Sequence, residues 1–406
     1  MKHVEAFSAD RPSLKEIFRD IGPVQLATGF IAFLFAATGP LAIILSVSTQ
    51  GGLTSAQMSS FVVGVFFING VLTMLMTLAY RTPISLFWTI PGTVLMGPAL
   101  THLSFAEVIG AFYATAIVVL ILGWTGLARR VLELIPLPVV MAMVAGIFLK
   151  FGLDVVRSLH QDLALAGAMV VTFFGLMAAP RVARFMPPVI GALIIGALVA
   201  VATGQFASGV LEGGLKLVQP VITAPDFSIP AMIELVVPFV ITILIVQNGQ
   251  GIAVITQAGH KAPITAMTIA CGVGGLISAV FGAVGTTLTG PTAGLITSAG
   301  PRERHYATCL VTGAFAILFG LMAPTFTQLM LSAPKALVLT LAGLAMMRVL
   351  LGSFSTAFKG PCGLGALTCF VVTVADLPLF NIGAAFWGLV SGVCVSALLE
   401  RADFQR

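Results

Sequence analysis

The sequence predicts an all-α polytopic membrane protein with about 14 transmembrane segments, arranged as two inverted seven-span repeats. Three observations predict this fold: an apolar composition, apolar stretches that recur along the whole chain, and two matching segments rich in glycine and proline. Of the 406 residues, 58% are hydrophobic and only 9% are charged, and the mean hydropathy is +1.08. Soluble domains carry roughly 25% charged residues, so this chain cannot cover a water-facing surface.

Apolar stretches of about 20 residues, long enough to cross a hydrocarbon core, recur from Ile21 to Leu399. Two shorter stretches, 85–101 and 284–299, are rich in Gly, Pro and Thr. The chain has fourteen spans if both short stretches cross, and twelve if neither does. Hydropathy places the clear spans near residues 26–47, 58–80, 105–124, 137–153, 163–179, 187–203, 231–256, 263–282, 305–323, 335–352, 361–376 and 381–399.

The distribution of Lys and Arg favours fourteen spans with both termini in the cytoplasm. In that arrangement four of the 20 basic residues face outside, namely Lys150, Arg157, Lys216 and Lys335, and the other 16 face the cytoplasm. Omitting both short spans would move five basic residues to the outer side, against the positive-inside rule: Arg129, Arg130, Arg181, Arg184 and Lys261. Residues 1–20 contain no apolar core, so we expect no cleaved signal peptide.

The longest hydrophilic connection, residues 204–230, divides the chain into residues 1–203 with spans 1–7 and residues 231–406 with spans 8–14. Because seven is an odd number, the second half enters the membrane from the opposite side. This is the pattern of an inverted repeat, in which many secondary transporters bind substrate between broken helices at mid-membrane.

The two short spans match each other in sequence. "GTVLMGPA" at Gly92–Ala99 and "GTTLTGPT" at Gly285–Thr292 share five of eight residues, and each belongs to the third span of its half. Two Gly-rich helices that pack closely are the alternative. Proline inside a helix costs about 3 kcal/mol or more, but this cost disappears at the first helical position. We therefore expect an extended segment followed by a half-helix that begins at Gly97-Pro98 in span 3 and at Gly290-Pro291 in span 10, with Pro91 as the alternative start in span 3.

Two half-helix N-termini that converge at mid-membrane would present free N–H groups and favour an anion. Span 8 adds three carboxamides in the stretch "QNGQ", for which interhelical hydrogen bonding is the alternative explanation. The candidate substrate-binding residues are Thr38, Gly92, Thr93, Gly97, Pro98, Gln247, Asn248, Gln250, Thr286, Thr287, Thr289, Gly290 and Pro291.

Three aromatic residues that flank the broken spans, Phe87, Trp88 and Phe281, are candidate ring contacts, and Glu234 is the candidate proton carrier. The five cysteines stand singly in apolar runs and are predicted to be buried packing residues, so we expect no metal site and no cofactor. The chain contains no Walker A motif, nucleophile elbow or HExxH, which argues against an enzyme or an ATP-driven pump. Its basic residues are scattered, so we expect no nucleic-acid partner.

Three stretches resemble the benzoate:proton symporter family (BenE): "QNGQGIAVI" (Gln247–Ile255), "GTTLTGPTAGLITSAG" (Gly285–Gly300) and "FWTIPGTVLMGPAL" (Phe87–Leu100). The chain is more distantly similar to uracil/xanthine permeases and to sulfate and bicarbonate transporters. The resemblance implies a core domain of spans 1–4 and 8–11 (about 21–124 and 231–323) and a gate domain of spans 5–7 and 12–14 (about 131–203 and 329–399). It also implies substrate between spans 3 and 10 against span 8, elevator-like transport, and often a dimer.

The nucleobase branch of that fold has acidic residues in spans 8 and 10, where this chain has "VQNGQ" and "TGPTA". Amides, hydroxyls and helix N-termini suit a carboxylate that acidic residues would repel. We therefore expect a proton-coupled importer of benzoate or a related aromatic carboxylate in a bacterial inner membrane. The alternatives are a carrier of another small anion or a nucleobase on the same fold, and an anion channel; a membrane enzyme has the least support.

Overall fold

The structure, a computed structural model, describes residues 4–8, 10–127, 136–183, 186–205, 216–377, 379 and 384–404. Arg129, Arg130 and Arg184, which contributed to the predicted orientation, lie outside these residues, as does the segment 206–215 of the long connection. The first half of the chain forms α1 (Leu14–Asp20), α2 (Pro23–Ala37), α3 (Gly39–Gln50), α4 (Ser55–Val62), η1 (Val63–Ile68), α5 (Asn69–Tyr80), β1 (Leu86–Trp88), α6 (Ile90–Ala99), α7 (Phe105–Thr125), α9 (Leu137–Gln161), α10 (Leu163–Ala178), α11 (Pro180–Ala183) and α12 (Pro188–Ala202).

The second half likewise contains a short strand followed by a short helix, between longer helices. It forms α13 (Ile229–Ala231), η2 (Met232–Val236), α14 (Val237–Ile241), η3 (Thr242–Asn248), α15 (Gly249–Gln257), α16 (Ile264–Val280), β2 (Thr286–Leu288), α17 (Gly290–Thr297), η4 (Arg302–Arg304), α18 (His305–Leu321), α19 (Ala323–Leu331), α20 (Lys335–Phe358), α21 (Gly363–Ala375), α22 (Ala384–Leu399) and α23 (Arg401–Phe404).

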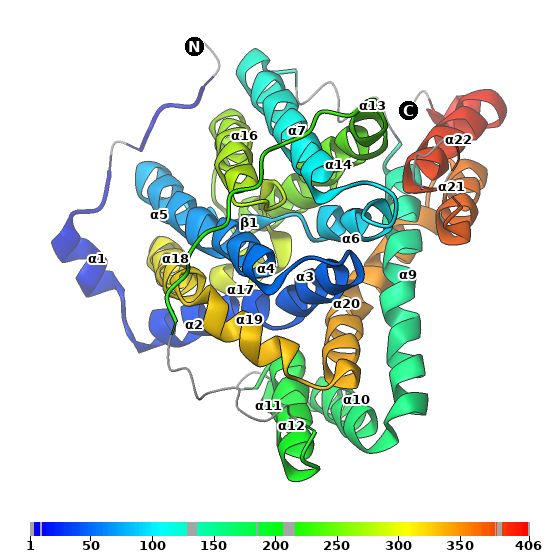
Figure 1. Cartoon of the computed structure of the whole chain (residues 1–406). Coiled ribbons are helices and arrows are strands. Elements are labelled where there is room, and N and C mark those ends of the chain that lie inside the picture. The colour runs from blue at the N-terminus through cyan, green and yellow to red at the C-terminus, as the bar shows by residue number, and fades with distance from the viewer. Residues whose placement is uncertain are drawn as a thin grey trace.

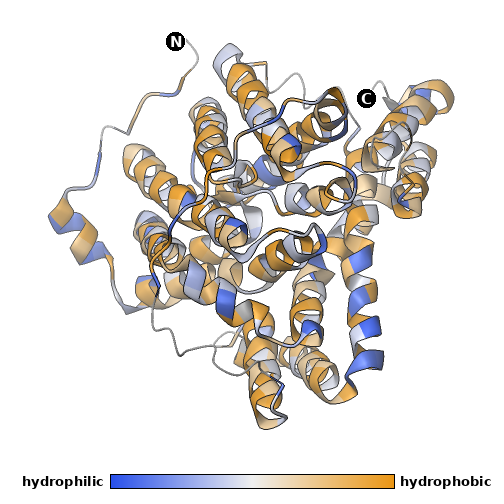
Figure 2. Ribbon diagram, in the orientation of Figure 1, coloured by the Kyte–Doolittle hydropathy of each residue, from blue (hydrophilic) through white to orange (hydrophobic). Residues whose placement is uncertain are grey.

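Within the described residues, seven helical stretches are long and apolar enough to cross a membrane, and five shorter apolar helices accompany them. Together with the two broken segments β1–α6 and β2–α17, they account for the fourteen predicted spans. Two helices extend past the predicted ends of their spans: α9 continues to Gln161 and α20 continues to Phe358. Figure 2 shows apolar residues over most of the bundle, with hydrophilic ones on α1 and on the C-terminal part of α9.

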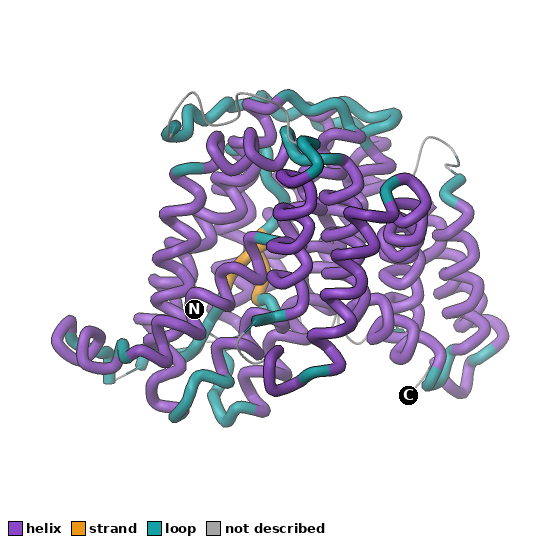
Figure 3. Tube along the Cα trace, turned by 90° about the horizontal axis from the view of Figure 1, so that it is seen from below, coloured by secondary structure: helices purple, strands orange, loops and turns teal. Residues whose placement is uncertain are grey.

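The broken spans meet in a two-stranded antiparallel ladder. Leu86 pairs with Leu288, Phe87 with Thr287 and Trp88 with Thr286. Figure 3 places these strands midway between the upper edge of the bundle, where the loop 216–228 runs, and the lower edge, toward which α1 and α23 lie. Non-helical backbone at this depth requires protein partners, and each broken span supplies them to the other. Antiparallel pairing follows from the opposite orientation of the two repeats.

The half-helix of span 10 begins where the sequence predicts it, with Pro291 in the first turn of α17. The prediction that the half-helix of span 3 begins at Gly97-Pro98 is wrong. α6 begins at Ile90 with Pro91 in its first turn, and Pro98 lies inside the helix near its end. The equivalent tetrapeptides are therefore "TIPG" at 89–92 and "TGPT" at 289–292, a separation of 200 residues. The five identities that suggested the other alignment involve residue types that are abundant in this chain.

The helices form two groups that Figure 1 shows side by side. In one group α18 packs on α2 and α5, and α16 packs on α7. In the other, α9 packs on α20 and α21, α21 on α22, and α10 on α12. Packing of α3 on α20 and of α6 on α9 joins the groups. We refer to them as the first helix group, which contains the ladder, and the second helix group.

The crossing of α7 and α16 depends on the small side of α16. A Cβ added to Gly272 would lie 2.7 Å from the backbone nitrogen and Cα of Leu120. Small residues at such crossings let two backbones approach closely in a membrane. Four of the five cysteines are buried as predicted, but Cys394 is exposed on α22. That part of the prediction is wrong, because Cys394 lies on a helix face that no described element covers.

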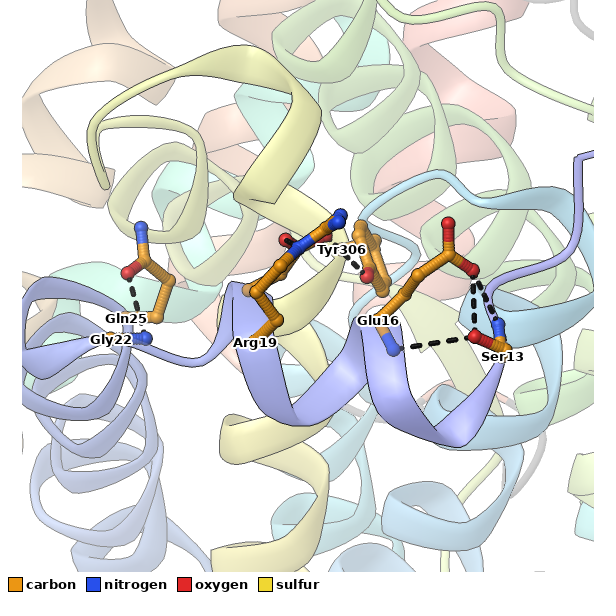
Figure 4. Close-up of polar contacts among 7 residues, drawn as sticks. Ser13, Glu16, Arg19, Gly22, Gln25 and Tyr306 are labelled. Carbon is orange, nitrogen blue, oxygen red and sulfur yellow. Dashed lines mark hydrogen bonds and ion pairs between the residues drawn. The ribbon is translucent and has the colours of Figure 1, made fainter.

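The short helix α1 is capped at its start and tied to the bundle at its end (Figure 4). Ser13 and Glu16 form a capping box at its start. At its end, the Tyr306 hydroxyl donates a hydrogen bond to Asp20 Oδ2 at 2.8 Å. Burial acts to raise the pKa of Asp20, but the hydrogen bonds from Tyr306 and Arg19 outweigh it and lower the pKa below its usual value. These contacts fix the start of span 1 against α18.

The connection between the repeats, 216–228, is extended and lies on the first helix group. The Val221 N–H donates to Ser60 Oγ at 2.6 Å, and the Asp226 N–H donates to the Ala106 carbonyl at 2.9 Å. These two bonds hold the connection against α4 and α7.

Candidate substrate-binding site

Span 8 is a continuous helix that is widened twice, at η2 and at η3. The π-helical segment η3 ends at Gln247 and Asn248, so the wide turn falls where the three carboxamides occur. Such segments are common at functional sites, because an extra residue per turn re-aims the side chains that follow. Gln247 is 5% exposed and Asn248 is 2% exposed.

Asn248 holds the strand ladder. Its Oδ1 accepts a hydrogen bond from the Leu288 N–H at 2.8 Å, and its amide and the Cys271 thiol are also in contact. Thr286 Oγ1 donates to Asn69 Oδ1 at 2.6 Å, and Thr73 Oγ1 accepts from the Leu86 N–H at 2.8 Å. These buried polar groups are satisfied within the protein, so Asn248 and Thr286 support the backbone of the site.

The two half-helix starts differ in their capping. Thr89 Oγ1 accepts a hydrogen bond from the Gly92 N–H at 3.1 Å at the start of α6 and donates one to Thr242 Oγ1 at 3.2 Å. At the start of α17, Thr289 makes no such cap; its hydroxyl donates to the Ser85 carbonyl at 3.4 Å. The first-turn N–H groups of α17 are therefore open to an anionic ligand, while one of those of α6 is already bonded.

A large cavity of about 1740 Å³ lies between the two helix groups. Its inner end is lined by Phe35, Ile90, Gln247 and Pro291, which also line a second cavity of about 20 Å³. The large cavity opens at the face near α1. Its lining there belongs to the first turns of α2, α9 and α12 and to the last turn of α20, at Val24, Leu137, Pro188 and Thr356.

The two cavities have different walls. One wall of the large cavity carries the polar side chains Gln247, Gln250 and Ser298, and the facing wall of α9 and α20 is mostly apolar, with Met141, Phe148 and Leu344 among its residues. The small cavity is closed in by Phe35, Ala36, Pro40, Phe87, Trp88, Ile90, Gln247, Thr289, Pro291 and Thr292. Its volume suffices for about one water molecule.

The structure brings six of the candidate side chains to these cavities. Gln247, Gln250 and Pro291 line the large one, and Phe87, Trp88 and Thr289 line the small one. Gly290 stands beside them, because a Cβ there would lie 2.5 Å from Gln250 Cγ. The other candidates are not part of either lining: Thr38, Gly92, Thr93, Gly97, Pro98, Asn248, Thr286, Thr287, Phe281 and Glu234.

Several of these other residues have a clear place in the structure. Thr38 separates α2 from α3, so span 1 is also broken, and its Oγ1 donates to the Phe35 carbonyl at 3.3 Å. Thr93 Oγ1 donates to the Thr89 carbonyl at 3.0 Å inside α6. Glu234 Oε2 lies 2.9 Å from His102 Nε2, at the opposite end of span 8 from the cavity opening. This pairing could not be predicted from the sequence, because 132 residues separate the two side chains.

Two polar atoms of the ladder, Trp88 Nε1 and Thr287 Oγ1, are buried and have no hydrogen-bond partner in the described residues. A buried donor without a partner costs about 1–3 kcal/mol. Trp88 also lines the small cavity. Its indole N–H is therefore a hydrogen-bond donor that a ligand beside the starts of α6 and α17 could use.

The sequence model of the BenE family, described as benzoate membrane transport protein, matches residues 19–398. The chain belongs to the BenE family. The site geometry above is thus that of a BenE protein, and the fold is that of a membrane transport family.

Two relatives match along almost their whole length. "Inner membrane protein YdcO" of Escherichia coli (strain K12) is 33% identical over 392 residues, covering 95% of this chain and 98% of the relative. "Benzoate membrane transport protein" of Acinetobacter baylyi (strain ADP1) is 26% identical over 396 residues, with the same 95% and 98% coverage.

Solved structures share the fold of this BenE chain. The transmembrane domain of the cyanobacterial bicarbonate transporter BicA superposes with a TM-score of 0.58 at 17% identity, covering 93% of this chain and 98% of that one. The murine Slc26a9 anion transporter in the inward-facing state gives a TM-score of 0.62 at 11% identity, covering 93% and 68%. The predicted all-α fold of two inverted seven-span repeats is confirmed.

Proposed function

We propose that this protein is a secondary active transporter that imports benzoate or a related aromatic carboxylate together with protons. The observation that carries the proposal is the cavity whose inner end joins the uncapped start of α17 to the amides of Gln247 and Gln250. An uncapped helix N-terminus and neutral amide donors suit a carboxylate. The relative named as a benzoate membrane transport protein supports the same substrate class.

In this proposal the carboxylate binds at the start of α17, and the Gln247 and Gln250 amides orient it. Thr292 and the Trp88 N–H are further donors around the small cavity, which shares Gln247 and Pro291 with the large one. Because the small cavity has room for about one water, the ring lies in the large cavity. There it is covered by Phe35 and by the apolar wall of α9 and α20.

We propose that the first helix group is the core domain and the second is the gate domain of an elevator-type carrier. The polar wall belongs to η3, α15 and α17 of the first group, and the apolar wall belongs to the second group. A sliding movement of one group against the other would carry the ligand, because the apolar side chains of α9 and α20, such as Met141, Phe148 and Leu344, make no directional bond that resists sliding. With both termini in the cytoplasm of a bacterial inner membrane, the cavity opens inward.

Uptake by purified protein in liposomes tests the proposal. We expect labelled benzoate to accumulate when the outside is made acidic, and to do so more slowly without a pH gradient. Unlabelled aromatic carboxylates should compete, and uracil and chloride should not. Accumulation of another anion or of a nucleobase, with no benzoate uptake, would show that the substrate is not an aromatic carboxylate. Conductance far above carrier turnover in bilayer recordings would indicate a channel.

Glu234 remains our candidate for the proton carrier, since it is a carboxylate that is 4% exposed inside span 8 and contacts a histidine. Glu234→Gln keeps a hydrogen-bonding side chain next to His102 but cannot titrate. We expect benzoate uptake by this variant to lose its response to an imposed pH gradient, with benzoate affinity within about twofold of wild type, because Glu234 lies away from the cavity lining. Glu303→Gln, at an exposed position, is the control. Uptake by Glu234→Gln that still follows the pH gradient would remove Glu234 from the proton pathway.

A further inference from the structure

One charged side chain lines the large cavity. Among the cavity-lining residues that the structure describes, only Arg348 carries a formal charge. It lies on α20, between the lining residues Leu344 and Gly352, one helical turn from each. The spacing of four residues places all three on one face of the helix.

Arg348 lies well inside the membrane-spanning part of the chain. Ten residues follow it before α20 ends at Phe358, which corresponds to about 15 Å of helix. The sequence suggested otherwise, because hydropathy ended this span near residue 352 and so grouped Arg348 with the cytoplasmic charges. Its side chain is exposed, and the space to which it is exposed is the cavity.

Among the described residues, no carboxylate compensates the charge of Arg348. In the part of the chain that the structure describes, Arg348 forms no ion pair and no hydrogen bond, and the cavity lining contains no Asp or Glu. A charged side chain inside a transmembrane segment is costly and typically marks the path of an ion or a charged substrate. The planar guanidinium, with five donors, matches a carboxylate.

We propose that Arg348 binds the substrate carboxylate in the open cavity and so increases the affinity of the inward-open state for anions. This rests on the proposed transport of an aromatic carboxylate. Arg348 belongs to α20 of the second helix group, whereas Gln247, Gln250 and α17 belong to the first. A carboxylate bound at the start of α17 can therefore also contact Arg348 only when the two helix groups are positioned with α17 facing Arg348. Arg348 therefore stabilises the substrate-bound carrier in its inward-open state.

The test measures binding of labelled benzoate to purified full-length protein in detergent. Arg348→Gln and Arg348→Met remove the charge, Arg348→Lys keeps it, and Lys359→Gln removes a charge just beyond the end of α20. We expect the Kd to rise about tenfold or more in both charge-removing variants, as for loss of a hydrogen bond to a charged group. The Kd of Arg348→Lys should stay within about threefold of wild type, and that of Lys359→Gln should be unchanged. Methionine is apolar, so Arg348→Met should still fold if the polar side chain of Arg348→Gln prevents folding at this depth.

A wild-type Kd in either folded charge-removing variant would overturn the role of Arg348, and so would an Arg348→Lys variant as weak as Arg348→Gln. Failure of the proposed function looks different. In that case the wild-type protein itself does not bind benzoate, and bicarbonate, sulfate and chloride are measured with the same variants. The role of Arg348 stands if removing its charge weakens whichever anion the wild type binds, and it falls if the wild type binds none of them.

Discussion

Gln247→Leu is expected to weaken benzoate binding about 10- to 100-fold and to reduce uptake at low benzoate concentration to the same extent. Gln247 lines both cavities and is 5% exposed, so its amide stands where the half-helix starts meet the open space. Leucine has nearly the same size but cannot donate to a carboxylate, and the loss of a hydrogen bond to a charged group costs about 1.5–3 kcal/mol. Equilibrium binding in detergent and initial rates of uptake in liposomes measure the two quantities.

Gln257→Leu is the matched control, because Gln257 is the last residue of the same helix, is exposed and does not line a cavity. It should bind and transport as wild type does. Equal affinities for wild type and a folded Gln247→Leu would show that the carboxylate binds elsewhere.

Gly272→Leu is expected to prevent stable assembly of the first helix group. The added Cβ would stand 2.7 Å from backbone atoms of Leu120 on α7, and backbone in a packed helix cannot shift as the end of a flexible side chain can. Overpacking of a well-packed core costs about 1–3 kcal/mol, occasionally more, and here a whole isobutyl group must be placed. Thermal unfolding in detergent should show a fall of several degrees or more, together with a lower yield of monodisperse protein.

Gly175→Leu makes the same change on α10, where a Cβ would meet nothing within 4 Å. Its unfolding temperature should match that of wild type. A Gly272→Leu variant as stable as Gly175→Leu would mean that α7 and α16 can separate without cost.

The twelve clear spans were predictable because each one is apolar and bounded by polar or glycine-rich segments. The inverted repeat was predictable for a different reason: an odd number of spans in each half leaves no other orientation. The start of α6 was predicted less well. Sequence identity favoured Gly97-Pro98, whereas the structural equivalence of the repeats depends on where an extended strand ends, which gives Pro91 and Pro291 the same role.

The site was predictable to the level of segments rather than of side chains. The stretch around Gln247 and the half-helix of span 10 do border the cavity. Which of two neighbouring amides faces the cavity depends on the wide turn of η3, and a pattern of residue types does not reveal a π-helical turn. Arg348 was assigned to the wrong environment because hydropathy shortened α20. The apolar wall from α9 and α20 could not be located, since it depends on how distant helices pack.

The ladder between Leu86–Trp88 and Thr286–Leu288 restricts how this protein can move. Its two strands come from different repeats, so a rocking motion that separated one half of the sequence from the other would have to break backbone hydrogen bonds in a region with no water to replace them. In the proposed elevator movement we therefore expect the two helix groups to slide along the contacts between α3 and α20 and between α6 and α9, where side chains meet without a shared ladder. The boundary between the two sequence repeats is thus not the boundary along which we expect the protein to move.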